Sequence, residues 1–135
     1  MKAYKAKACP TEWEEQCAVV AWANLMVETR QEPRLDFLVG SASGARLTIG
    51  NLMKLKRAGV IKKAWPDLFL AVPRFSRLEQ TYYGLFIELK RIKGGTVSAE
   101  QAIMIGDLQS LGYKAIVCRG ADHAIQTIKE YLGMP

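Results

Sequence analysis

Two short apolar stretches in the middle of the chain have the pattern of buried β-strands. Residues 65–72 and residues 82–90 are rich in aromatic and aliphatic side chains and are bounded by turn-forming residues. Because successive side chains of a strand point to opposite faces, Phe86, Glu88 and Lys90 share one face, and the other face is aliphatic. The second strand is therefore expected to place a carboxylate beside an ammonium group at the end of an apolar segment.

Periodicity and capping patterns divide the rest of the chain into helices and further strands. Thr11–Glu14 and Ser98–Gln101 have the capping-box pattern that opens a helix, and Gly59 has the position of a C-cap glycine. The first helix is apolar nearly all round after Gln16, which is typical of a buried helix. The expected elements are, in chain order, a helix from Glu12 to about Val27 or Arg30, a strand at 34–39, a helix at 47–58, the two strands above, a helix opened by Ser98 that runs to about 111, a strand at 113–118 and a helix at 121–132. This order predicts an α/β fold with one central mixed β-sheet flanked by helices.

Composition limits the class of protein. The chain of 135 residues, half of them apolar, predicts a single domain over 1–135 with a basic segment at 1–10. No apolar run reaches membrane-spanning length, so we expect a soluble protein without membrane contact. Three cysteines without zinc-binding spacing predict reduced thiols in a cytoplasm. The net charge of +6 favours a polyanionic partner, with nucleic acid first.

Asp67 is expected to join Glu88 and Lys90 if the two central strands pair. Buried charges are costly unless they are paired or bind a cation, and two interpretations satisfy this condition. In the first, Asp67 and Glu88 are hard oxygen ligands of Mg²⁺, while Lys90 orients the attacking water or neutralises charge on a phosphorus. In the second, Glu88 and Lys90 form a structural ion pair, and Asp67 caps a turn after Pro66. The alternative chemistry of a Ser-His-Asp scheme is not favoured, because the chain has a single histidine, His123, without a partner nearby in sequence.

The order of these motifs resembles a known family. Pro66-Asp67 followed by Glu88-Leu89-Lys90 resembles the signature of the PD-(D/E)XK nuclease superfamily. Four stretches around this signature resemble the VRR-NUC family: 56–60, 65–68, 83–90 and 97–101. The resemblance runs from Glu12 to about Leu132. The resemblance implies a restriction-endonuclease-like core and a metal-dependent deoxyribonuclease that uses Mg²⁺, with Mn²⁺ as a plausible substitute.

The resemblance also implies further site residues. The family carries a Glu in its first helix with a Gln four residues on, which matches Glu12 and Gln16, and Glu15 is the fallback for the metal-ligand role. Acids in a first turn also favour the helix dipole without any function. The family further implies the backbone carbonyl of Leu89 as a metal ligand and places Gln101 near the metal, although Gln101 also has a capping role. Both alternatives stay open at this point.

Basic residues gather next to the proposed site. They lie around the end of the helix at 47–58 or just after the strand that carries Glu88, and comprise Lys54, Lys56, Arg57, Lys62, Lys63, Arg91 and Lys93. A run of charge is usually a solvated face, but this position favours contacts with DNA phosphates. The glycine-rich loop at 40–46 either approaches a DNA backbone or is a plain connector.

The resemblance implies an endonuclease of the stand-alone phage or bacterial type, selective for branched DNA such as four-way (Holliday) junctions and acting in DNA repair. The alternatives are a flap nuclease or exonuclease with the same chemistry, and a DNA-binding module without activity. Because one chain has one set of catalytic residues and a four-way junction needs two symmetric cuts, we expect a homodimer. The first helix, with Trp22 and Met26, and the helix at 47–58 are the candidate interfaces. The expected location is the cytoplasm of a bacterial or phage-infected cell.

Overall fold

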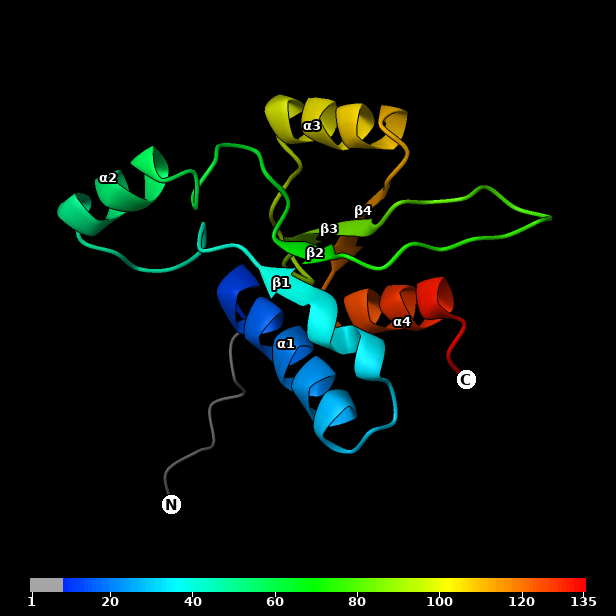
Figure 1. Ribbon diagram of the computed structural model, residues 1–135. Coiled ribbons are helices and arrows are strands. Elements are labelled where there is room, and N and C mark those ends of the chain that lie inside the picture. The colour runs from blue at the N-terminus through cyan, green and yellow to red at the C-terminus, as the bar shows by residue number, and fades with distance from the viewer. Residues whose placement is uncertain (1–8) are drawn as a thin grey trace, which may run out of the picture.

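Four strands form one mixed sheet in the computed structural model, which describes residues 9–135 (Figure 1). The strands are β1 (Leu38–Gly40), β2 (Leu68–Leu70), β3 (Leu85–Lys90) and β4 (Lys114–Arg119), and they lie in the sheet in chain order. The pairs β1–β2 and β2–β3 are antiparallel, and β3–β4 is parallel. Strand β3 therefore has a hydrogen-bonded neighbour on each side. Most of the basic segment expected at 1–10 lies outside the described residues.

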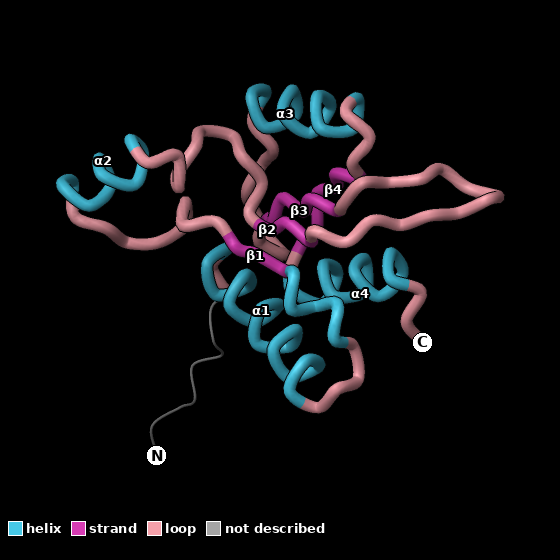
Figure 2. The backbone as a smooth tube through the Cα atoms, in the orientation of Figure 1, coloured by secondary structure: helices cyan, strands magenta, loops and turns pink. Residues whose placement is uncertain are grey.

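The helices lie on both faces of this sheet (Figures 1 and 2). They are α1 (Glu12–Glu28), α2 (Ile49–Arg57), α3 (Ala99–Ser110) and α4 (Ala121–Leu132), with a 3₁₀ helix, η1, at Pro33–Phe37. Helices α1 and α4 contact each other and β3 on one face, and α3 packs against β4 on the other. Helix α2 stands apart from the sheet, and none of its residues is buried. The result is the α/β fold with a flanked central sheet that the element order predicts.

The alternation along β3 separates two cores. Leu85, Ile87 and Leu89 belong to the larger apolar core, together with residues of α1 and α4 such as Val19 and Ile128. Phe86 belongs to a smaller cluster under α3, with Leu108 and Ala115. All six residues of β3 are buried, so the charged side chains at its end lie at the same depth as the apolar ones.

Three expected strands differ from the structure. The strand expected at 34–39 is mostly η1, and only Leu38–Gly40 pairs with β2. Pro33 stands at the start of η1, where its fixed φ favours a helical turn, and the Glu32 carboxylate accepts a hydrogen bond from the N–H of Arg34. The two central strands are also shorter than the apolar stretches that predicted them, because pairing covers only three residues of β2.

The prediction that α1 is buried all round is wrong. Its buried residues are Glu15, Gln16, Val19 and Ala23, whereas Leu25 keeps about half of its surface exposed, at 51%. Many of the other positions are small or apolar, so the residue pattern alone does not reveal which face meets the sheet and α4. Only the face that carries these four residues is covered.

The helix ends follow the predicted capping chemistry. Thr11 Oγ1 accepts from the N–H of Glu14 at the start of α1, although no return bond from Glu14 closes the box among the described residues. Gly59 follows the end of α2 with a φ of +76°, a conformation that favours glycine. Helix α4 spans the predicted residues. None of the helices in the described part of the chain combines the length and apolar character needed to cross a bilayer.

Candidate active site

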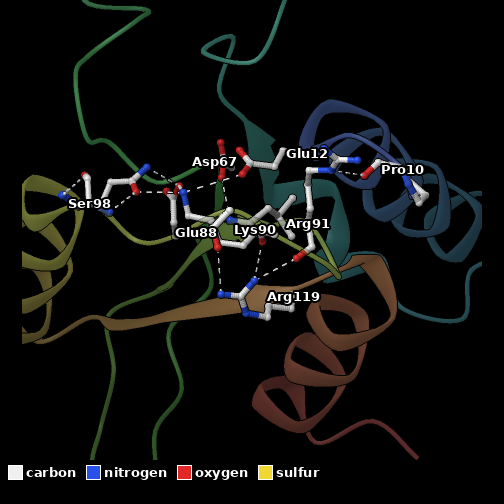
Figure 3. A network of polar contacts seen from close by, with 12 residues as sticks. Pro10, Glu12, Asp67, Glu88, Lys90, Arg91, Ser98 and Arg119 are labelled. Atoms are coloured by element: carbon white, nitrogen blue, oxygen red, sulfur yellow. Dashed lines mark hydrogen bonds and ion pairs between the residues drawn. The ribbon is translucent and has the colours of Figure 1, made fainter. Parts of the chain in front are cut away.

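Asp67, Glu88 and Lys90 meet where β2 begins and β3 ends (Figure 3). The Leu68–Ile87 pair is the last rung between the two strands, and the N–H of Leu89 lies beyond it. That N–H donates to Asp67 Oδ2 at 2.7 Å, so the Asp67 carboxylate takes the place of the next backbone acceptor. Lys90 Nζ lies 3.5 Å from Glu88 Oε1, on the shared face that the alternation predicts. The cluster lies at the end of an internal strand rather than at an edge of the sheet.

Gln101 connects the start of α3 to this cluster. Its Nε2 donates to Glu88 Oε1 at 2.8 Å, and its Oε1 accepts from Lys90 Nζ at 3.0 Å. The same Oε1 accepts from the N–H of Ser98 at 3.1 Å, which completes the capping box of α3. One side-chain amide therefore both caps the helix and contacts the charged pair of β3.

The structure separates the two glutamates of the first turn of α1. Glu12 Oε1 lies 3.9 Å from Lys90 Nζ, so the Glu12 carboxylate belongs to the cluster. Glu15 is buried elsewhere, and its Oε2 accepts from the N–H of Ala121 at 2.5 Å, at the start of α4. Because α4 has no capping side chain of its own, Glu15 supplies this cap and is not directed at Asp67 or Glu88.

Gln16 supports the backbone on the other side of Asp67. Its Nε2 donates to the carbonyl of Ser41 at 2.8 Å, and the N–H of Ser41 donates to the carbonyl of Asp67, also at 2.8 Å. The loop that contains Ser41 is therefore tied to both α1 and Asp67. This contact gives the glycine-rich stretch a structural role beside the site.

Burial and mutual repulsion shift the two carboxyl groups in the same direction. Burial raises the pKa of Glu88 to about 8, and the charge of Asp67 adds to the shift while Lys90 opposes it. Burial also raises the pKa of Asp67, against the hydrogen bond from Leu89, and the Glu12 charge raises it further. Two adjacent carboxylates are therefore unfavourable as a bare pair, and a bound cation would favour their charged forms.

The donor set fits a divalent cation with oxygen preference. One oxygen of each carboxylate is held by the N–H of Leu89 or of Gln101, and the described residues supply no N–H donor to the other oxygen. Within residues 9–135, no group of three or more His, Cys, Asp or Glu side chains is arranged to hold a metal. Asp67 and Glu88 are the two carboxylates that could hold such an ion, and Glu12 lines the same pocket as a further carboxylate for the ion or its water.

A pocket of about 560 Å³ opens over the carboxylates. Lys56, Lys62 and Lys63 line it with Trp13 and Trp65, whereas the other predicted DNA-binding residues do not. Lys54 and Arg57 lie exposed in the last turn of α2, and Lys93 is exposed after β3. The wall of this pocket is therefore basic on the side where α2 leads into β2.

Arg91 differs from the other predicted DNA-binding residues. Its Nη2 donates to the carbonyl of Cys9 at 2.9 Å and its Nε to that of Pro10 at 3.3 Å, so the guanidinium is engaged within the chain. Arg119, which the sequence did not single out, makes similar contacts with the turn after β3. No motif marks Arg119; only the parallel pairing of β3 with β4 places it opposite Lys90.

Comparison with known proteins agrees with this arrangement. The model of the VRR-NUC domain matches residues 5–122. A solved structure described as a VRR_NUC domain protein superposes with a TM-score of 0.70 at 29% identity, covering 96% of this chain and 93% of that chain. No curated protein matches the chain. The mixed sheet with flanking helices is consistent with a restriction-endonuclease-like core, and Asp67, Glu88 and Lys90 lie together where β2 begins and β3 ends. The chain therefore belongs to the VRR-NUC family of nucleases.

Proposed function

We propose that the protein is a Mg²⁺-dependent DNA endonuclease whose site is built from Asp67, Glu88 and Lys90. The observation that carries this proposal is a pair of adjacent carboxyl groups with raised pKa values, Glu88 buried and Asp67 half-buried, which lines a pocket that also holds lysines. A purely structural ion pair needs only one carboxylate for Lys90. The second carboxylate and the open pocket favour a site that receives a cation and a phosphate.

Each residue has a distinct role in phosphodiester hydrolysis. Asp67 and Glu88 would hold the ion, together with the backbone carbonyl of Leu89 that the family implies. Bound Mg²⁺ would supply charge neutralisation at the scissile phosphate and polarise its oxygens. The Lys90 ammonium, held by Gln101 Oε1, is placed to orient the attacking water and to stabilise negative charge as the bond to phosphorus forms. Glu12, whose carboxylate lies 3.9 Å from Lys90 Nζ and lines the same pocket as Asp67 and Glu88, would be a further ligand of the ion or of its water.

The lysines on the pocket wall position the DNA backbone. Lys62 and Lys63 are exposed and Lys56 lines the same pocket, so their ammonium groups can contact phosphates without leaving an internal partner unpaired. Lys63 does pair with Glu100 at 3.1 Å, but both side chains are exposed, and such a pair is worth little in water. Exchange of this partner for a phosphate is therefore inexpensive.

We infer further that two copies act together on branched DNA. One chain carries one site, and a four-way junction requires two cuts related by symmetry. Of the two candidate interfaces, α1 presents Trp22 and Met26 to the apolar core, where they are already packed. Helix α2 instead exposes Ile49 and Met53, at 82% and 44%, and so favours contact with a second copy.

A cleavage assay on three DNA structures tests the proposal. Labelled linear duplex, 5′-flap and four-way junction DNA are incubated with the protein, with Mg²⁺ and with a chelator, beside the Glu88→Gln variant. We expect Mg²⁺-dependent paired cuts in the junction, none with chelator and none with the variant, and light scattering should give a dimer. Cleavage of flaps by a monomer would replace the junction proposal with the flap-nuclease alternative. Binding without cleavage of any substrate would indicate the inactive DNA-binding module.

A further inference from the structure

The turn that follows β3 is held by one arginine from β4. Arg119 Nη1 donates to the carbonyls of Arg91 at 3.2 Å and Gly94 at 3.0 Å, and its Nη2 donates to that of Gly95 at 3.2 Å. Gly94 and Gly95 both have positive φ, so the turn folds back sharply here. A planar guanidinium can bind several carbonyls in this way, whereas a lysine ammonium lacks the same fork.

The folded-back turn lies against the catalytic cluster. A Cβ atom added to Gly95 would stand 3.6 Å from Glu12 Oε1 and 3.9 Å from Lys90 Cδ. The Glu12 carboxylate and the Lys90 stem therefore lie beside the open face of Gly95. Any displacement of this turn would free Glu12 to move away from Lys90.

A second contact ties the same turn to the start of α1. The Arg91 guanidinium donates to the carbonyls of Cys9 and Pro10, immediately before Thr11, which caps the helix that begins at Glu12. Figure 3 shows Arg91 beside Pro10, and Arg119 below Glu88 and Lys90. Two routes, one through Gly95 and one through Arg91, therefore converge on Glu12.

We propose that Arg119 and Arg91 are positioning residues of the metal site, which together hold the 91–95 turn and the start of α1 so that the Glu12 carboxylate stays beside Lys90. The inference rests on the proposed function, because it concerns the same site. It also reassigns Arg91, since a guanidinium that donates to two backbone carbonyls stabilises the protein's own backbone and is not free for a DNA phosphate.

The direction of the effect on cation affinity distinguishes positioning from charge. Removal of a positive charge near a cation site should strengthen cation binding, because repulsion falls. If the arginines position Glu12, Arg119→Ala and Arg91→Ala should instead weaken binding. The change expected for residues that support metal ligands is about 10-fold or more. Arg119→Lys keeps the charge but not the fork, and should weaken binding as well.

The experiment measures Mn²⁺ binding to the full chain without DNA, from the electron paramagnetic resonance signal of the free ion. Arg119→Ala, Arg119→Lys and Arg91→Ala are compared with the wild type and with Arg77→Ala, an exposed arginine in the loop between β2 and β3. Thermal unfolding of each variant identifies any that fail to fold. If Arg119→Ala fails to fold, Arg91→Ala still tests the inference, because it keeps all three Arg119 contacts. We expect about 10-fold weaker Mn²⁺ binding in the three test variants and no change in Arg77→Ala.

A double-mutant cycle with Glu12→Gln tests whether the arginines act through Glu12. In the Glu12→Gln background, Arg119→Ala should weaken Mn²⁺ binding no further, because its target is already lost. An undiminished 10-fold loss in that background would overturn the inference. Unchanged or tighter binding in all the arginine variants would overturn it too. A wild-type protein that binds no Mn²⁺ would instead overturn the proposed function itself.

Discussion

The two faces of β3 are equally buried but differ in character, since one is apolar and the other carries charged side chains. On one face, Leu85, Ile87 and Leu89 pack in the larger apolar core. On the other, Phe86 is followed by Glu88 and Lys90, which are 3% and 5% exposed. Burial of apolar surface stabilises a fold, whereas burial of charge destabilises it unless partners compensate. The apolar face thus stabilises the strand inside the fold, and the charged face carries the residues of the proposed metal site.

Leu89 joins the two faces. Its side chain has no exposed surface and packs in the larger core, while its backbone N–H donates to Asp67. Well-packed cores resist displacement, so the apolar face holds the backbone on which the carboxylates depend. The comparison teaches that the site tolerates its unfavourable charges because the opposite face supplies both stability and rigidity.

The largest expected effect comes from the charged face. Glu88→Gln or Asp67→Asn removes a ligand charge with little change of shape, and should lower the rate of DNA cleavage with Mg²⁺ by about 10³-fold or more. The folded protein should be no less stable, and DNA binding should persist or tighten, since a carboxylate that repels phosphate is gone. Gel-based cleavage rates beside thermal unfolding measure both. Retained cleavage would place the site elsewhere.

The matching substitution on the apolar face is Ile87→Ala. It leaves a cavity beneath the sheet and should lower the free energy of unfolding by about 2–5 kcal/mol, as for other buried aliphatic truncations. Activity per folded molecule should stay far above that of Glu88→Gln. Chemical denaturation gives the stability, with the exposed Leu25→Ala as a control that should change little. A loss of cleavage without a loss of stability would contradict the division between the faces.

The charged face should contribute a distinct pH dependence of stability. The pKa of Glu88 is about 8 in the folded protein against an ordinary value of 4.5, so the folded state binds this proton more tightly than the unfolded chain does. In chelator, the free energy of unfolding should therefore be highest near pH 4.5 and fall as the pH rises through about 8. Denaturation at a series of pH values measures the slope, which Glu88→Gln should reduce. A rise in stability over this window would contradict the pKa shift.

Gln101→Ala removes the amide that orients Glu88 and Lys90 and should slow cleavage by about 10–100-fold, the range for groups that orient metal ligands. Because the same amide completes the cap of α3, unfolding should also become easier by about 1 kcal/mol. Kinetics and denaturation on one preparation separate the two effects. Ser98→Ala is the control, since it removes the hydroxyl cap and leaves Gln101 in contact with Glu88.

The smallest expected effect is on DNA affinity. Lys62→Glu combined with Lys63→Glu should weaken binding to all DNA sequences alike and flatten its dependence on salt, because fewer counterions are displaced. Filter binding or fluorescence anisotropy in chelator, at several salt concentrations, provides the measurement. Lys129→Glu on α4, which does not line the pocket, should keep the wild-type salt dependence. An unchanged salt response in the double variant would leave the positive charge of the chain without a role at this site.

Local patterns in the sequence were sufficient for several features of the protein. The alternation in β3, the capping box at Ser98 and Gln101 and the bounds of α4 each depend on residues a few positions apart, whose backbone geometry is set by the element itself. Glu88 and Lys90 lie within one strand, so the alternation alone predicts their shared face, whereas Asp67 was joined to them through the family resemblance.

Only the tertiary structure distinguished residues of the same type that stand in the same local sequence pattern. Glu12 and Glu15 are both acids in one helical turn, but Glu15 meets the N–H of Ala121, 106 residues away along the chain, while Glu12 meets Lys90. Arg91 is one of the basic residues predicted to contact DNA, and its guanidinium donates to the carbonyl of Cys9, 82 residues before it. The 3₁₀ helix before β1 likewise has an Arg34 contact with the carbonyl of Leu132, 98 residues away. Such partners are chosen by how the sheet and helices pack, which no short-range pattern records.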